Sequence, residues 1–246
     1  MKHFFLLLFM FSALLTGPFF QAQPAFAADE SAPVVVELFT SQSCSSCPPA
    51  DKYLGELAGK GHVITLSCHV TYWDHLQWKD TLSRKFCTER QYAYDDHIKG
   101  HNVFTPQIVV NGTYSSVGSR RGDVGRSMKL AQQQAALGAV GITATGDGKI
   151  NVTLKNGFKP DAPADLYVFA VRAAYHQNIA SGENKGRSID YTNAAMAVVE
   201  KNGIDLVSSG ADNVEFDGLE EKPDGYIVLL QDRATMKVVA AGQFFY

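Results

Sequence analysis

The chain has 246 residues, of which 46% are hydrophobic and 19% are charged, and its formal net charge at pH 7 is −3. This composition is typical of a folded globular protein and disfavours the disordered, collagenous and coiled-coil classes. The chain has 22 Lys and Arg residues against 25 Asp and Glu residues, and it has no basic run. A protein that binds nucleic acid or an anionic membrane is therefore disfavoured as well.

The first 27 residues are predicted to be a secretory signal peptide. Lys2 precedes an apolar run over residues 4–15, and Ala25-Phe26-Ala27 supplies small residues at the spacing of a cleavage site. The run is shorter than the roughly 20 residues that a transmembrane helix needs. We therefore expect a periplasmic or secreted protein that is not inserted in a membrane after signal cleavage.

A pair of cysteines lies between a predicted strand and a predicted helix. Residues 34–39 are an apolar run typical of a buried strand, and an amphipathic helix is predicted after Pro48-Pro49. Cys44 and Cys47 lie between the two elements. Because the N–H groups and the dipole of a helix start favour a thiolate, we expect Cys44 to be an exposed nucleophile and Cys47 to be its resolving partner.

The later segments predict two regions that differ in secondary structure. Strands are predicted at residues 62–70, 103–110 and 113–117, with Asn111-Gly112 as a hairpin turn, and helices at residues 82–98 and 123–137. From residue 139 to residue 246, short β-like runs separated by turn residues predict a small all-β, antiparallel sandwich-like domain. Residues 193–199 are ambiguous between helix and strand, and residues 182–187 either connect two strands or dock on a partner or on the dithiol.

The order of these elements resembles the thioredoxin fold over residues 33–138. The motif FTSQSCSSCPPAD at residues 39–51 is similar to that of a secreted bacterial thioredoxin-like family of uncharacterised function, and residues 69–74, 78–80 and 182–187 extend the likeness. The resemblance implies an α/β thioredoxin-like fold with an insertion at about residues 71–100, followed by the small all-β domain. It also implies a cis Thr105-Pro106 bond that lies against the dithiol and positions the substrate.

Four further side chains are candidates around the dithiol. By the same resemblance, Glu37 is a candidate for a buried acid that moves protons, with a salt-bridged or edge-exposed glutamate as the alternative. Tyr72, Trp73 and Trp78 are candidates for a substrate-binding platform, and the alternative is that their rings form a local core.

The remaining cysteines and the histidines leave several interpretations open. Cys68 and Cys87 are predicted to form a structural disulfide, with two separate thiols or a second redox pair as alternatives. Five of the seven histidines lie between residues 62 and 101, and with the dithiol they suggest a soft-metal site such as one for Cu(I). Their spacing matches no compact ligand pattern, so no metal ligand is predicted; these residues are His62, His69, His75, His97 and His101.

The sequence therefore predicts a thiol-disulfide oxidoreductase-like protein that acts on protein disulfides through Cys44 and Cys47. Such exchange needs no bound cofactor. The expected partners are protein disulfide or dithiol substrates and an unidentified redox partner, without nucleic acid. The alternative is a thioredoxin-like module for copper delivery or protein assembly that carries out no turnover.

Overall fold

The computed structural model describes residues 33–98, 102–145, 148–203, 211–217, 219 and 221–246. The predicted signal peptide, residues 1–27, lies outside the described residues. No helix within the described ranges is long and apolar enough to cross a membrane.

Helices and strands are mixed up to residue 132, and the described elements after that residue are strands. The first part contains β1 (Val34–Thr40), α1 (Pro48–Ala58), β2 (Val63–His69), α2 (Lys85–His97), β3 (Gln107–Val110), β4 (Tyr114–Val117) and α3 (Arg121–Gln132). The second part contains β5 (Gly138–Ala144), β6 (Lys149–Leu154), β7 (Ala164–Asn178), β8 (Ser188–Lys201), β9 (Ala211–Glu215), β10 (Gly225–Asp232) and β11 (Val238–Phe245). The ambiguous segment 193–199 is thus part of a strand, and the helix predicted over residues 123–137 ends at Gln132.

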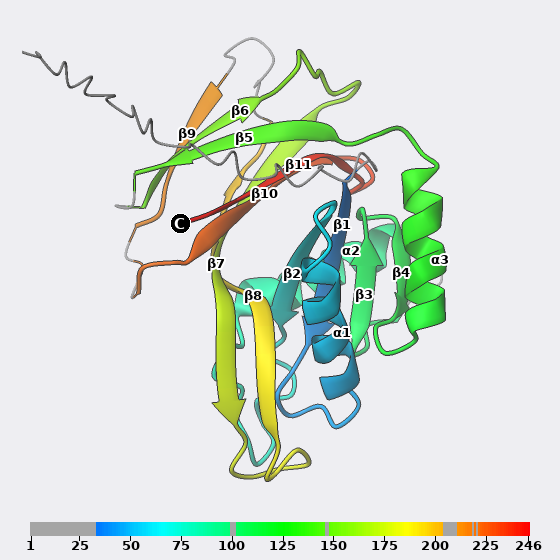
Figure 1. The fold of residues 1–246 in the computed structure, drawn as a ribbon, viewed down its shortest axis with the longest axis vertical. Coiled ribbons are helices and arrows are strands. Elements are labelled where there is room, and N and C mark those ends of the chain that lie inside the picture. The colour runs from blue at the N-terminus through cyan, green and yellow to red at the C-terminus, as the bar shows by residue number, and fades with distance from the viewer. Residues whose placement is uncertain (1–32, 99–101, 146–147, 204–210, 218, 220) are drawn as a thin grey trace, which may run out of the picture.

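All of these strands belong to one mixed sheet, with the order β4-β3-β1-β2-β8-β7-β10-β11-β5-β6-β9 (Figure 1). Strand β1 pairs in parallel with β2 and antiparallel with β3. Strand β2 pairs in parallel with β8 through Ser67 and Ala194. The long strands β7 and β8 form an antiparallel ribbon that extends away from the rest of the sheet, beside α1 (Figure 1).

The predicted division into a thioredoxin-like α/β fold and a separate small all-β domain is wrong. The structure is instead a single sheet of eleven strands with three short helices among the described residues, and it is mostly β. One hydrophobic core contains side chains from both parts of the chain, among them Phe39, Phe169 and Ile227. The physical reason is that an exposed apolar edge of β2 is unfavourable, and β8 covers that edge by pairing with it.

The helices lie on both faces of the first four strands. Val36 and Leu38 of β1 face α1 and α3, whereas Val35 and Phe39 belong to the core on the other face, which α2 covers. Figure 1 shows α1 and α3 on the near side of these strands and α2 behind them. Side chains of β1 therefore alternate between a face that carries α1 and a face that carries α2.

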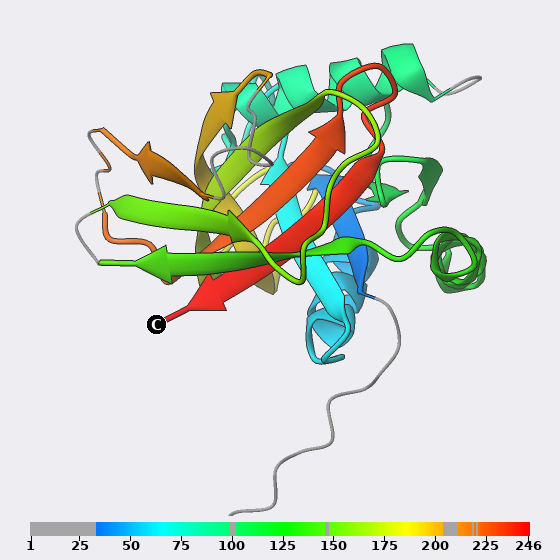
Figure 2. The ribbon, with the colours of Figure 1, turned by 90° about the horizontal axis from the view of Figure 1, so that it is seen from above.

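The far end of the sheet folds back on itself. Strands β5, β6 and β9 curl over β7, β10 and β11, as the view from above shows (Figure 2). A second core lies between these layers and includes Val152, Val168 and Tyr226. This core contains no residue of β1, of α1 or of the loop that carries the cysteine pair.

Candidate active site

The cysteine pair lies in the loop between β1 and α1. Cys44 and Cys47 form a disulfide with a Cα–Cα distance of 5.4 Å. Two successive turns build this loop, because the amide of Cys44 donates to the carbonyl of Ser41 and the amide of Cys47 donates to the carbonyl of Cys44. Cys47 is the N-cap of α1, and Pro48 opens the helix at a position that needs no N–H donor. The helix therefore begins at the second cysteine.

The prediction that Cys44 is exposed is wrong. Cys44 is 3% exposed and Cys47 is 0% exposed, whereas Ser45 and Ser46 between them face solvent. The hydroxyl of Ser46 lies 3.4 Å from the sulfur of Cys44. A reaction partner therefore reaches this disulfide only after groups around it have moved.

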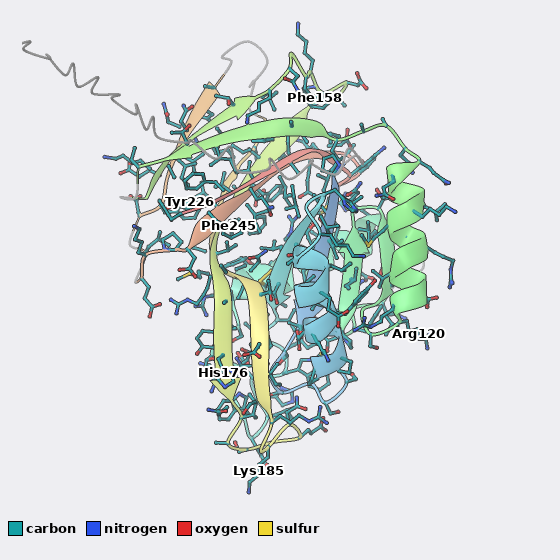
Figure 3. The ribbon with its side chains drawn as sticks, in the orientation of Figure 1. Arg120, Phe158, His176, Lys185, Tyr226 and Phe245 are labelled. Carbon is teal, nitrogen blue, oxygen red and sulfur yellow. A yellow bond between two sulfur atoms is a disulfide. The ribbon has the colours of Figure 1, made fainter. Side chains whose placement is uncertain are left out.

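The loop between β7 and β8 closes over the cysteine pair. The side-chain amide of Asn184 donates to the carbonyl oxygens of Gln42 and Cys44, each at 2.9 Å. Asn184 is 0% exposed, and Ser181 of the same loop donates to the carbonyl of Gln77 at 2.9 Å. Lys185 marks the outer tip of the ribbon in Figure 3. Residues 182–187 thus connect β7 to β8 and also contact the dithiol loop directly.

The aromatic side chains of the predicted platform are divided between two packing sites. Trp78 packs in a small core under the β7–β8 ribbon, and its indole N–H donates to Gln42 Oε1 at 2.9 Å. Tyr72 and Trp73 pack against the core that α2 covers, and the indole N–H of Trp73 donates to Thr105 Oγ1 at 2.9 Å. All three rings are partly buried. The two indole hydrogen bonds thus hold Gln42 of the dithiol loop and Thr105 before Pro106.

The Thr105-Pro106 peptide bond is cis, as the resemblance implied. The next residue, Gln107, begins β3 and pairs with Phe39 of β1. Because β1 continues past Phe39 into the dithiol loop, Pro106 lies at the same end of the sheet as the two cysteines. The carbonyl of Pro106 accepts a hydrogen bond from the amide of Gly118 at 2.8 Å.

Glu37 lies on the face of β1 that α2 covers, opposite the face that carries α1. It is 0% exposed, and its carboxylate accepts two hydrogen bonds from Arg90, from Nε at 2.6 Å and from a terminal nitrogen at 3.1 Å. The hydroxyl of Tyr94 also donates to it. Glu37 therefore forms a buried ion pair with Arg90 on the face of the sheet opposite α1, and it does not contact Cys44 or Cys47.

The other two cysteines form a disulfide within the core. Cys68 of β2 and Cys87 of α2 are joined with a Cα–Cα distance of 5.2 Å, and both are 0% exposed. They lie on the α2 face of the sheet, among Leu66, Val70 and Tyr94. This bond holds α2 to the strand that it covers.

A buried polar cluster, which the sequence analysis did not assign, lies between α1 and the sheet. Thr40 of β1 donates to Asp51 Oδ1 of α1 at 2.8 Å. Nδ1 of His69, the last residue of β2, lies 2.7 Å from Asp80 Oδ2, and Tyr191 of β8 packs edge-on against the His69 ring. Asp51, His69 and Asp80 are 3%, 1% and 2% exposed. These three residues are called the acid–histidine cluster below.

Burial and pairing perturb the ionisation of this cluster. Burial raises the pKa of Asp51 from 3.8 to about 7, although His69 and the Thr40 hydroxyl act to lower it. Burial acts to lower the pKa of His69, but the Asp80 carboxylate outweighs it and the pKa is raised. Burial acts to raise the pKa of Asp80, but His69 and two backbone N–H groups outweigh it and the pKa is lowered. His69 and Asp80 thus form an ion pair beside a carboxyl group that titrates near neutrality.

Two signals in the sequence point to this cluster. Asp51 follows Cys47 by four residues, which places both on one face of α1. Ser67 and His69 alternate with Leu66 and Cys68, so they project to the face of β2 opposite the α2 core. No local pattern links Asp80 to these positions, because it lies in the irregular segment after β2.

The histidines do not gather around the cysteine pair. His69 pairs with Asp80, His97 contacts the carbonyl of Ala93, and His75 is exposed. His101 lies outside the described residues. Within the described part of the chain, no group of three or more His, Cys, Asp or Glu side chains could hold a metal ion.

Similarity to known proteins extends over this whole region. Residues 35–231 match the family described as "Protein of unknown function (DUF1223)". The crystal structure of a structural-genomics target protein from Agrobacterium tumefaciens is similar, with a TM-score of 0.68 and 28% sequence identity over 89% of this chain and 96% of that one. No curated protein matches the chain. The family match includes the dithiol loop, the acid–histidine cluster and the β7–β8 loop.

Proposed function

The chain belongs to the DUF1223 family, and we propose that it is a thiol-disulfide oxidoreductase that acts on protein disulfides through Cys44 and Cys47. The observation that carries the proposal is the position of this disulfide in a two-turn loop at the start of α1, apart from the core disulfide of Cys68 and Cys87. The spacing of Cys44 and Cys47, with two residues between them, supports the same chemistry, because thiol pKa values are often lowered in Cys-x-x-Cys motifs. Two sulfurs bridged over so short a loop exchange partners without unfolding the sheet.

The proposed reaction is a two-step exchange that starts from the reduced dithiol. The Cys44 thiolate attacks one sulfur of a substrate disulfide, so a bond from Cys44 to that sulfur forms and the other substrate sulfur leaves as a thiolate. Cys47 then attacks the Cys44 sulfur, which closes the Cys44–Cys47 bond and releases the second substrate thiolate. Two electrons pass from the protein to the substrate, and a redox partner returns them.

The surroundings of the dithiol support further roles within the proposed reaction. Cys47 is at the start of α1, where the positive end of the helix dipole favours a thiolate. Thr105 and Pro106 lie at the same end of the sheet, and the partly buried Thr105 is the proposed contact for a substrate chain. The bonds from Asn184 to the dithiol loop must break before a protein substrate reaches Cys44. A periplasmic or secreted location is part of the proposal, since disulfide exchange between proteins belongs to such compartments.

The test is a redox titration of the purified protein against glutathione, with the thiols read out by mass after alkylation. We expect the Cys44–Cys47 pair to open and close reversibly while Cys68 and Cys87 stay bonded. A Cys47→Ser variant should accumulate a mixed disulfide through Cys44, and a Cys44→Ser variant should not. A dithiol that never reacts with a disulfide, but takes up Cu(I) stoichiometrically until both cysteines are replaced, would instead support metal delivery.

A further inference from the structure

The acid–histidine cluster has no role in the exchange described so far, although it lies under the helix that carries Cys47. The amide of Asp51 donates to the carbonyl of Cys47 at 3.1 Å, so the two residues are separated by one helical turn. In this arrangement, side chains four positions apart are neighbours, with Cβ atoms about 5–6 Å apart. Cys47 is 0% exposed and Asp51 is 3% exposed, so both side chains are buried.

Asp51 has a carboxylate oxygen available for a proton. Oδ1 accepts the hydroxyl of Thr40, but Oδ2 has no hydrogen-bond partner among the described residues although it is fully buried. A buried polar atom without a partner is costly, and a redox or catalytic role is one of the reasons for which a protein keeps such an atom. We propose that Asp51 accepts the proton that Cys47 loses when its sulfur attacks Cys44 in the mixed disulfide.

The groups that face Asp51 come from three elements. They are His69 from β2, Asp80 from the segment after β2 and Tyr191 from β8. The His69–Asp80 ion pair carries no net charge, but its imidazolium acts to lower the pKa of Asp51, against the effect of burial. The outcome is a carboxyl group whose pKa of about 7 lies in the range that suits a general base near neutral pH. The ion pair is therefore a positioning element for Asp51.

The candidate from the sequence, Glu37, is less well placed for this role. Its two oxygens are bonded to Arg90 and Tyr94, and it projects to the opposite face of β1 from α1. Asp51, by contrast, shares a helix face with the sulfur that must be deprotonated. The inference rests on the proposed function, because it assigns the proton of the second exchange step.

The step balances in atoms and electrons. The Cys47 thiol gives its proton to Asp51 Oδ2, and the resulting thiolate displaces the substrate sulfur from Cys44. One S–S bond forms as another breaks, and the substrate leaves as a thiolate. In the reverse direction, the protonated Asp51 returns the proton to Cys47 when a reductant opens the disulfide.

The test follows the reduced protein in stopped flow with dithiobis(nitrobenzoic acid), an aromatic disulfide that releases a coloured thiolate at each step. Attack by Cys44 releases one coloured thiolate, and resolution by Cys47 releases a second. In Asp51→Asn, we expect the first release to keep its rate within about twofold and the second to slow by on the order of 100-fold. Glu56→Gln, on the exposed face of the same helix, should change neither release.

The dependence on pH separates proton transfer from a merely structural effect. In the wild type, the rate of the second release should have an inflection near pH 7, where Asp51 titrates. Thr40→Val removes the hydrogen bond to the carboxylate and should move this inflection upward by about one pH unit. This variant keeps Asp51, so it provides a test even if Asp51→Asn does not fold.

Failure of the role of Asp51 and failure of the proposed function give different results. If the first release is rapid, but the second has the same rate and the same inflection in the Asp51 and Thr40 variants as in the wild type, the role of Asp51 is refuted and the proposed function stands. If the first release is no faster than that of a free thiol such as glutathione, the proposed function itself fails.

Discussion

The raised pKa of Asp51 makes a quantitative prediction about stability. In the unfolded chain the carboxyl group ionises around its ordinary value of 3.8, whereas in the folded protein burial raises the pKa to about 7. Between these values the folded state holds a proton that the unfolded state has released, so stability falls as the pH rises through this window. The contribution of Asp51 to the free energy of unfolding is therefore most favourable below pH 3.8 and least favourable above pH 7.

Asp51→Asn removes this dependence. Asparagine keeps an oxygen that accepts the Thr40 hydroxyl, but it does not ionise. Between pH 5 and pH 7 the wild type should lose stability relative to the variant, at about 1.4 kcal/mol per pH unit at first and about half of that at pH 7, or about 2 kcal/mol in all. The His69–Asp80 ion pair is present in both proteins, so the difference between them reports on Asp51 and on its charge interaction with His69.

The assay is chemical denaturation of both proteins, with their disulfides intact, at half-unit steps of pH from about 5 to 8. Glu56→Gln is the matched control, because the hydrogen bond with Arg121 lowers the pKa of Glu56 and keeps this group ionised throughout the window. A free-energy difference between Asp51→Asn and the wild type that stays constant across the window would refute the assignment of a buried, neutral-titrating carboxyl group to Asp51.

Three further predictions concern the surroundings of the site. Asn184→Ala should speed reduction of the Cys44–Cys47 bond by dithiothreitol roughly 30-fold, because two hydrogen bonds of about 1 kcal/mol each no longer hold the loop closed, whereas Lys185→Ala should leave the rate unchanged. Glu37→Gln should lower the free energy of unfolding by about 3 kcal/mol, because Arg90 then stays buried without a counter-charge. A large loss of exchange rate in the folded variant would contradict this purely structural role of Glu37. Replacing Cys68 and Cys87 together by alanine should destabilise the protein by about 3 kcal/mol, because the unfolded chain regains the entropy that the closed loop had removed. Exchange at Cys44–Cys47 should be retained. A stable but inactive double variant would make Cys68 and Cys87 part of the reaction.

Local chemistry in the sequence was sufficient for the elements around the cysteines. The apolar run before Cys44 and the two prolines after Cys47 place a strand, a loop and a helix correctly, because each depends on neighbouring residues alone. The Asn111-Gly112 pair is a second case: both residues adopt positive φ, at 48° and 66°, as a tight hairpin turn requires.

The tertiary structure decided which of these pieces meet. Strand β8 covers the edge of β2, and Asn184 reaches the carbonyl of Cys44 across 140 positions of sequence. Asp51, His69 and Asp80 gather in the same way, on a helix, a strand and a loop that no shared periodicity connects. Propensity and hydrophobic alternation act over a few residues, whereas the burial of the cysteines and the charge of their surroundings depend on which distant segment packs against them.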